Sequence, residues 1–145
     1  MELIDSHCHL EKFHAKGELE ATLERAAKAG VWRVITIGTS GDDWALYQQL
    51  ATECAGQIYW AAGLHPCDVE ADWERQVTQL PVFCESGTRP VAVGEIGLDY
   101  FHMPKEPEAV ADKKRWQEAA FRWQLDLASR YELPIVVHSR NAFAD

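Results

Sequence analysis

Strand-like and helix-like segments alternate along this chain without interruption, and this alternation narrows the fold more than any other property. Short apolar runs typical of strands occupy residues 3–6, 31–38, 57–66, 90–97 and 134–140. Segments with apolar residues at helical spacing lie between them, at residues 17–30, 39–54, 68–80 and 113–133. A regular β–α alternation with apolar strands predicts a parallel sheet covered by helices. The predicted fold class is therefore α/β.

Each predicted helix carries its apolar residues on one face. In the last helix this face consists of Trp116, Ala120, Trp123, Leu127 and Tyr131. Trp44, Tyr47 and Leu50 form the equivalent face in the second helix, and Trp73, Val77 and Leu80 form it in the third. We interpret these aromatic stripes as core rather than as a cofactor-binding surface.

Charge and cysteine content exclude several kinds of protein. The formal net charge of −9 argues against a basic surface that grips nucleic acid through many phosphates, although an enzyme can still hold one phosphate through metal ions. The four cysteines, Cys8, Cys54, Cys67 and Cys84, form no CxxC pair. We therefore expect neither a zinc ribbon nor a disulfide framework, and we expect most of the cysteines to be small buried residues.

The chain also lacks the patterns of membrane and secreted proteins. No apolar run approaches the ~20 residues that a membrane span needs. Glu2 and Asp5 stand where a signal peptide would be basic or apolar. The expected location is the cytoplasm, with no membrane partner.

Reactive side chains gather where the predicted strands end. They are His7 and His9 after the first strand, His65 after the third, Glu95 in the fourth, and His138 with Arg140 in the fifth. The carboxyl ends of parallel strands meet at one edge of the sheet, where α/β proteins assemble active sites. We therefore expect one functional site at this edge.

The triplet HCH suggests the chemistry of that site. On a strand, His7 and His9 point to one face and Cys8 to the other, so the two imidazoles can bind one metal ion. Two histidines satisfied by neighbouring hydrogen bonds are the alternative. Glu95 and His138 at equivalent strand ends favour a metal, because imidazoles and a carboxylate suit Zn, Mn and similar ions. Two ions bridged by a carboxylate can activate water for hydrolysis.

Five segments together resemble a known family: IDSHCHL, GLHP, VAVGEIGLDYF, FRWQLDLA and LPIVVHSRNAFAD. In order and spacing they are similar to the TatD-like metal-dependent deoxyribonucleases of the amidohydrolase superfamily, from residue 3 to the end. The resemblance implies a TIM barrel with two divalent metal ions (Zn, Mn or Mg) that cleaves phosphodiester bonds at DNA ends.

The resemblance also implies roles for individual residues. His7 and His9 match ligands of the first metal, Glu95 matches the catalytic bridging carboxylate, and His138 matches a ligand of the second metal. His65 and Arg140 match positions that line the substrate side, with a loop-capping role as the alternative for His65. Asp99 is expected to support the ligands from behind. His14 and His102 lie in polar loops and are given no role.

Two further motifs of that family, a HxFSG-type histidine and an ETDxP-type aspartate, have no match in this chain. A complete barrel needs eight strands and about 250 residues. We therefore interpret residues 1–145 as the N-terminal portion of a single barrel domain, with about five of its eight βα units and an incomplete metal site. The rest would come from a missing C-terminal half or from self-association.

Two other functions remain open at this point. Another amidohydrolase would keep the metals but act on a non-nucleic-acid ester or amide; the carboxylated lysine common in such enzymes has no candidate here. A non-catalytic chain would bind a metal or a partner through its open sheet edge. Metal content distinguishes that chain from an enzyme.

Overall fold

The chain forms a parallel sheet flanked by helices. A computed structural model describes residues 2–144. Its strands are β1 (Leu3–Cys8), β2 (Val31–Ile37), β3 (Ile58–Ala62), β4 (Ala92–Asp99) and β5 (Ile135–Arg140). Its helices are α1 (Glu11–Ala15), α2 (Leu19–Lys28), α3 (Gly41–Glu53), the 3-10 helix η1 (Pro66–Asp68), α4 (Trp73–Val77), α5 (Leu80–Cys84) and α6 (Pro107–Arg130).

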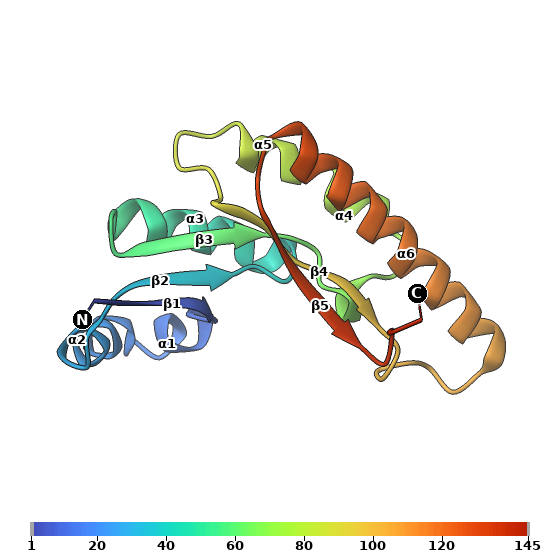
Figure 1. Ribbon diagram of the computed structural model, residues 1–145, viewed down its shortest axis with the longest axis horizontal. Helices are drawn as coiled ribbons and strands as arrows, with labels where there is room; N and C mark the ends of the chain where they lie inside the picture. The colour runs from blue at the N-terminus through green and yellow to red at the C-terminus, as the bar shows by residue number, and fades with distance from the viewer. Residues whose placement is uncertain (1, 145) are drawn as a thin grey trace.

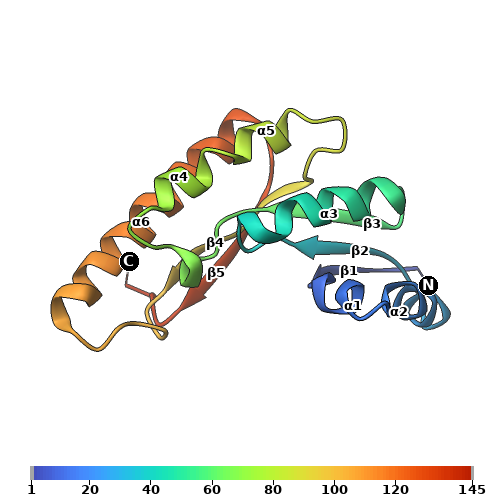
Figure 2. The same ribbon diagram turned by 180° about the vertical axis from the view of Figure 1, so that it is seen from behind.

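The five strands pair in chain order, β1-β2-β3-β4-β5, and every pair is parallel. This confirms the predicted α/β fold class. Helix α3 lies behind the strands in Figure 1 and in front of them in Figure 2. The core fills the space between the sheet and its helices, where Trp44, Tyr47 and Trp60 are almost completely buried.

Strands β3 and β4 pair over a short length and then separate. Their register covers only Ala61 with Ala92 and Ala62 with Val93. Two buried glutamines of α6 bond the backbone beyond this point. Gln124 accepts from Leu64 N at 2.7 Å and donates to Leu64 O at 3.2 Å, while Gln117 accepts from Asp99 N at 2.9 Å.

These glutamines correct the predicted inward face of the last helix. Ala120 and Leu127 are buried as expected, but Trp116 and Trp123 are only partly buried. Gln117 and Gln124 occupy the centre of the interface, because the separated strand ends leave backbone groups that need polar partners.

Several predicted boundaries were also wrong. The single helix predicted over 68–80 is divided into η1, α4 and α5, because Val69 is extended, with ψ of 117°, and is buried. Pro81 lies in the first turn of α5, where its missing N–H costs nothing. Helix α1 was not predicted, and α6 begins at Pro107, well before residue 113.

The two edge strands and several apolar side chains of the sheet remain exposed, as expected for a partial barrel. Among the described residues, β1 pairs only with β2, and β5 pairs only with β4. The large apolar side chains of Ile4, Trp32 and Val137 are 56%, 52% and 51% exposed. Within residues 2–144, no helix combines the length and hydrophobicity required to cross a bilayer.

Candidate metal centre

Glu95 lies at the centre of the predicted site, on β4. Its backbone N–H donates to Gly38 O at 2.8 Å, which ties β4 to the end of β2. The Oε2 atom lies 3.4 Å from His7 Nε2 on β1, although β2 and β3 separate the two strands in the sheet. The sheet therefore curves enough to bring its first and fourth strands together at this edge.

The two carboxylate oxygens of Glu95 contact histidines on opposite sides. Oε2 faces His7, whereas Oε1 lies 3.1 Å from His138 Nδ1 on β5. The donor atoms of His7, His9 and Glu95 lie within 4.8 Å of one another, and so do those of His65, Glu95 and His138. Each group offers the nitrogen and oxygen ligands of a divalent metal, and Glu95 belongs to both.

Asp99 lies behind His138, at the end of β4. Its side chain is fully buried, and Oδ2 lies 3.0 Å from His138 Nε2. Burial would raise the pKa of Asp99, but contacts with His102, His138 and Phe101 outweigh burial and hold the pKa well below its usual range. The ionised carboxylate orients His138 with Nδ1 toward Glu95.

His65 caps the loop after β3, as the alternative interpretation predicted, and its place on the substrate side stays a prediction. Its Nδ1 accepts from Cys67 N at 3.1 Å and so caps η1. Its ring centroid also lies 4.4 Å from that of His138. Burial, aided by the neighbouring imidazole of His138, lowers the pKa of His65, which favours the neutral imidazole that a metal requires.

Arg140 lies apart from this group. Its guanidinium stacks over the ring of Phe101, with Cζ 3.8 Å from the ring centroid. The residue pairs with Asp99 in the β4–β5 register, so it belongs to the same edge of the sheet. A substrate contact by Arg140 stays a prediction.

Two residues near the site were missed by sequence reasoning. The sequence gives no role to His102 and predicts Cys67 only as one of several small buried residues. Both contact the Asp99 carboxylate: His102 Nδ1 lies 2.9 Å and Cys67 Sγ lies 3.5 Å from Asp99 Oδ2. Of the four cysteines, only Cys84 is fully buried. The spacing of His65 and Cys67, which repeats the i, i+2 spacing of His7 and His9, was the available signal.

Gly97 permits the close approach of β4 and β5 beside the site. It has φ of +142°, and a Cβ there would lie 2.0 Å from the backbone oxygen of His138. A larger residue would therefore separate the strands that carry Glu95 and His138.

Known proteins provide an independent comparison. The family model described as TatD related DNase matches residues 4–145. The uncharacterized metal-dependent hydrolase YjjV of Escherichia coli K12 is 39% identical over 138 residues, which cover 94% of this chain and 50% of that protein. The 3'-5' ssDNA/RNA exonuclease TatD of Yersinia pseudotuberculosis is 30% identical over 140 residues, covering 97% of this chain and 51% of the relative.

The solved structures agree with the sequence comparison. The crystal structure of YjjV from Escherichia coli superimposes with a TM-score of 0.81 at 38% identity, covering 96% of this chain and 51% of that one. The chain thus spans about half the length of the curated relatives it matches. Because the family model extends over nearly every residue, we conclude that this chain belongs to the TatD related DNase family.

Proposed function

We propose that this chain carries one part of a two-metal hydrolase site, Glu95 with its neighbouring histidines, and that the complete site cleaves phosphodiester bonds at the ends of DNA. One observation carries the proposal. The two oxygens of Glu95 face histidines from the two edge strands, at 3.4 Å on one side and 3.1 Å on the other. A carboxylate placed in this way can bridge two ions. The name of the Yersinia relative, a 3'-5' ssDNA/RNA exonuclease, supports a nucleic-acid substrate.

Different residues would bind the two ions. His7 and His9 would hold one divalent ion, while His138 and His65 would hold the other, and Glu95 would contact both. Such ions supply charge stabilisation for phosphate and lower the pKa of water. Asp99 keeps the His138 ring in place from behind.

The net charge of −9 is consistent with this assignment of roles. An acidic protein does not bind a long nucleic acid through its general surface, because phosphate and carboxylate repel each other. The metal ions would then provide the local positive charge, with Arg140 as an additional cation at the same edge. Substrate binding should therefore depend on the ions.

The experiment measures metal content and hydrolysis on the same preparation. Elemental analysis of the purified protein gives divalent ions per chain, and release of nucleotides from single-stranded DNA gives activity. Glu95→Gln keeps the size of the side chain but removes its charge, so we expect both ions to bind more weakly and activity to fall by at least about 100-fold. The control is Glu74→Gln on the exposed surface of α4, which should match the wild type.

Each outcome identifies a different function. Retained hydrolysis in Glu95→Gln would contradict the bridging role. A wild-type chain that binds metal but releases no nucleotides would act by itself as a metal-binding module, with hydrolysis left to the complete barrel. Hydrolysis of amide or lactone substrates in place of DNA would assign the chain to another branch of metal-dependent hydrolases.

A further inference from the structure

A second group of metal-ligating side chains lies next to the Glu95 site. Cys67 belongs to η1, Asp99 ends β4, and His102 follows in the next loop. Cys67 Sγ lies 3.5 Å from Asp99 Oδ2 and 3.6 Å from His102 Nδ1, and His102 Nδ1 lies 2.9 Å from Asp99 Oδ2. The three ligand atoms therefore lie within one coordination sphere, since all are within 4.8 Å of one another.

The local backbone brings these three residues together. Asp99 Oδ1 accepts from Phe101 N at 2.9 Å and from His102 N at 2.8 Å, which turns the chain back and places the His102 ring beside Oδ2. Lys113 Nζ donates to Cys67 O at 3.3 Å and fixes the position of η1. The arrangement is therefore held by bonds that do not use the three ligand atoms themselves.

The fully buried Asp99 Oδ2 has more neighbours than it can bond at once. His138 Nε2, His102 Nδ1 and Cys67 Sγ lie 3.0, 2.9 and 3.5 Å from it. A carboxylate oxygen offers about two lone pairs. If one accepts from His138, the imidazole and the thiol share the other. A cation between Cys67, His102 and Asp99 removes this competition, because each of the three then contributes a lone pair to the ion.

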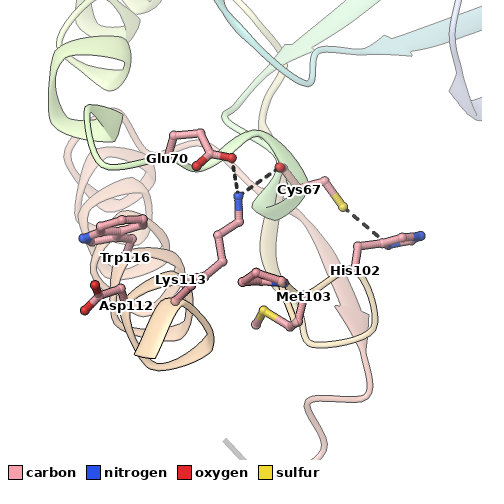
Figure 3. A pocket seen from close by; sticks show the side chains of 9 residues that line it. Cys67, Glu70, His102, Met103, Asp112, Lys113 and Trp116 are labelled. Atoms are coloured by element: carbon pink, nitrogen blue, oxygen red, sulfur yellow. Dashed lines mark hydrogen bonds and ion pairs between the residues drawn. The ribbon is translucent and has the colours of Figure 1, made fainter. Parts of the chain in front are cut away.

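A cavity borders the cluster. It has a volume of about 470 Å³, and Cys67 and His102 line it together with Met103, Lys113 and Trp116. Figure 3 shows the Cys67 and His102 side chains directed toward each other, with Lys113 bonded to Glu70 in the same wall. The cluster is therefore reachable by small ligands from this cavity.

We propose that Cys67, Asp99 and His102 form a third metal site, which takes a zinc-class divalent ion and leaves a fourth coordination position to an exchangeable ligand. Sulfur, nitrogen and oxygen ligands together suit Zn²⁺, and three protein ligands with an open position are typical of reactive rather than structural zinc sites. Because a thiolate is the form of cysteine that binds a metal, binding forms a sulfur–metal bond and releases the thiol proton to solvent.

Cobalt tests this site separately from the Glu95 site. Co²⁺ bound to a thiolate gives a charge-transfer absorption in the near ultraviolet, and neither group around Glu95 contains a cysteine. Titration of the metal-free protein with Co²⁺ should produce this band, with a final amplitude that corresponds to one thiolate-bound ion per chain. Added Zn²⁺ should then abolish it.

Variants assign the band to its residues. Cys67→Ser should lose the band, whereas the matched control Cys54→Ser, also partly buried, should keep it. The double variant His7→Ala with His9→Ala should also keep it, so failure of the proposed hydrolase site is distinguishable from failure of this one. A wild-type protein without the band at saturating Co²⁺, or a band that survives Cys67→Ser, would overturn the proposal.

Discussion

Gln117 holds the backbone on which the candidate site is built. Its side chain is fully buried and makes three hydrogen bonds: it accepts from Asp99 N at 2.9 Å and donates to Pro66 O at 3.0 Å and Asp99 O at 3.1 Å. These bonds connect α6 to the end of β4 and to the start of η1. Replacement by methionine keeps the length of the side chain and removes all three bonds.

The cost follows from the groups left behind. Asp99 N would become a buried donor without a partner, at about 1–3 kcal/mol, and the two carbonyls would each lose one acceptor bond. We therefore expect Gln117→Met to lower the free energy of unfolding by about 2–4 kcal/mol. Urea denaturation followed by circular dichroism measures this difference. The control is Gln49→Met, at an exposed position of α3, with an expected change within about 0.5 kcal/mol.

The prediction has a second part, because Gln117 positions Asp99 and Asp99 orients His138. Metal affinity should decrease in Gln117→Met even under conditions where the variant remains folded. Unfolding free energies for Gln117→Met and Gln49→Met that agree within about 0.5 kcal/mol would refute the assignment of the three bonds.

Three further predictions concern stability and metal binding. Gly56→Ala places a side chain at a positive φ and should cost about 1–2 kcal/mol of stability. Gly97→Ala should cost more, because φ is also positive there and the new Cβ would lie 2.0 Å from backbone. Equal thermal denaturation midpoints for the two variants would contradict this. Burial raises the pKa of Asp43, so ionised Asp43 disfavours the folded state above its ordinary pKa. The unfolding free energy of the wild type relative to Asp43→Asn should thus rise as pH falls from 7 toward 4, and a pH-independent difference would exclude burial as the cause. The double change His7→Ala with His9→Ala should remove one metal equivalent in elemental analysis, and unchanged content would dismiss both ligands.

The sequence was sufficient to predict the parallel architecture and the convergence of reactive groups. Alternating segments determine the sheet, and parallel strands bring their carboxyl ends to one edge, so the order of residues alone places His7, Glu95 and His138 together. Their contact across non-neighbouring strands depends on sheet curvature, which the apolar pattern does not describe.

Polar contacts within the core were harder to predict. Hydrophobic periodicity predicts that Trp116 and Trp123 of α6 are buried and that glutamines are exposed. Gln117 and Gln124 are buried instead, because the separation of β3 and β4 leaves backbone groups that need polar partners. His102 was missed for a related reason. Its position depends on the turn closed by Asp99 Oδ1, and the spacing of two polar residues in a loop does not reveal such a turn.

The two edge strands have a consequence for dynamics. Among the described residues, β1 and β5 each pair with a single neighbour, so either can open locally without breaking the hydrogen bonds between the other strands. Both edges nevertheless carry a histidine that contacts Glu95. Two ions that both contact Glu95 would connect both edges of the sheet to its fourth strand. Amide hydrogen exchange should then slow in β1 and β5 when metal is added and change little in β3, so that metal occupancy can be followed by the protection of backbone amides in the two edge strands.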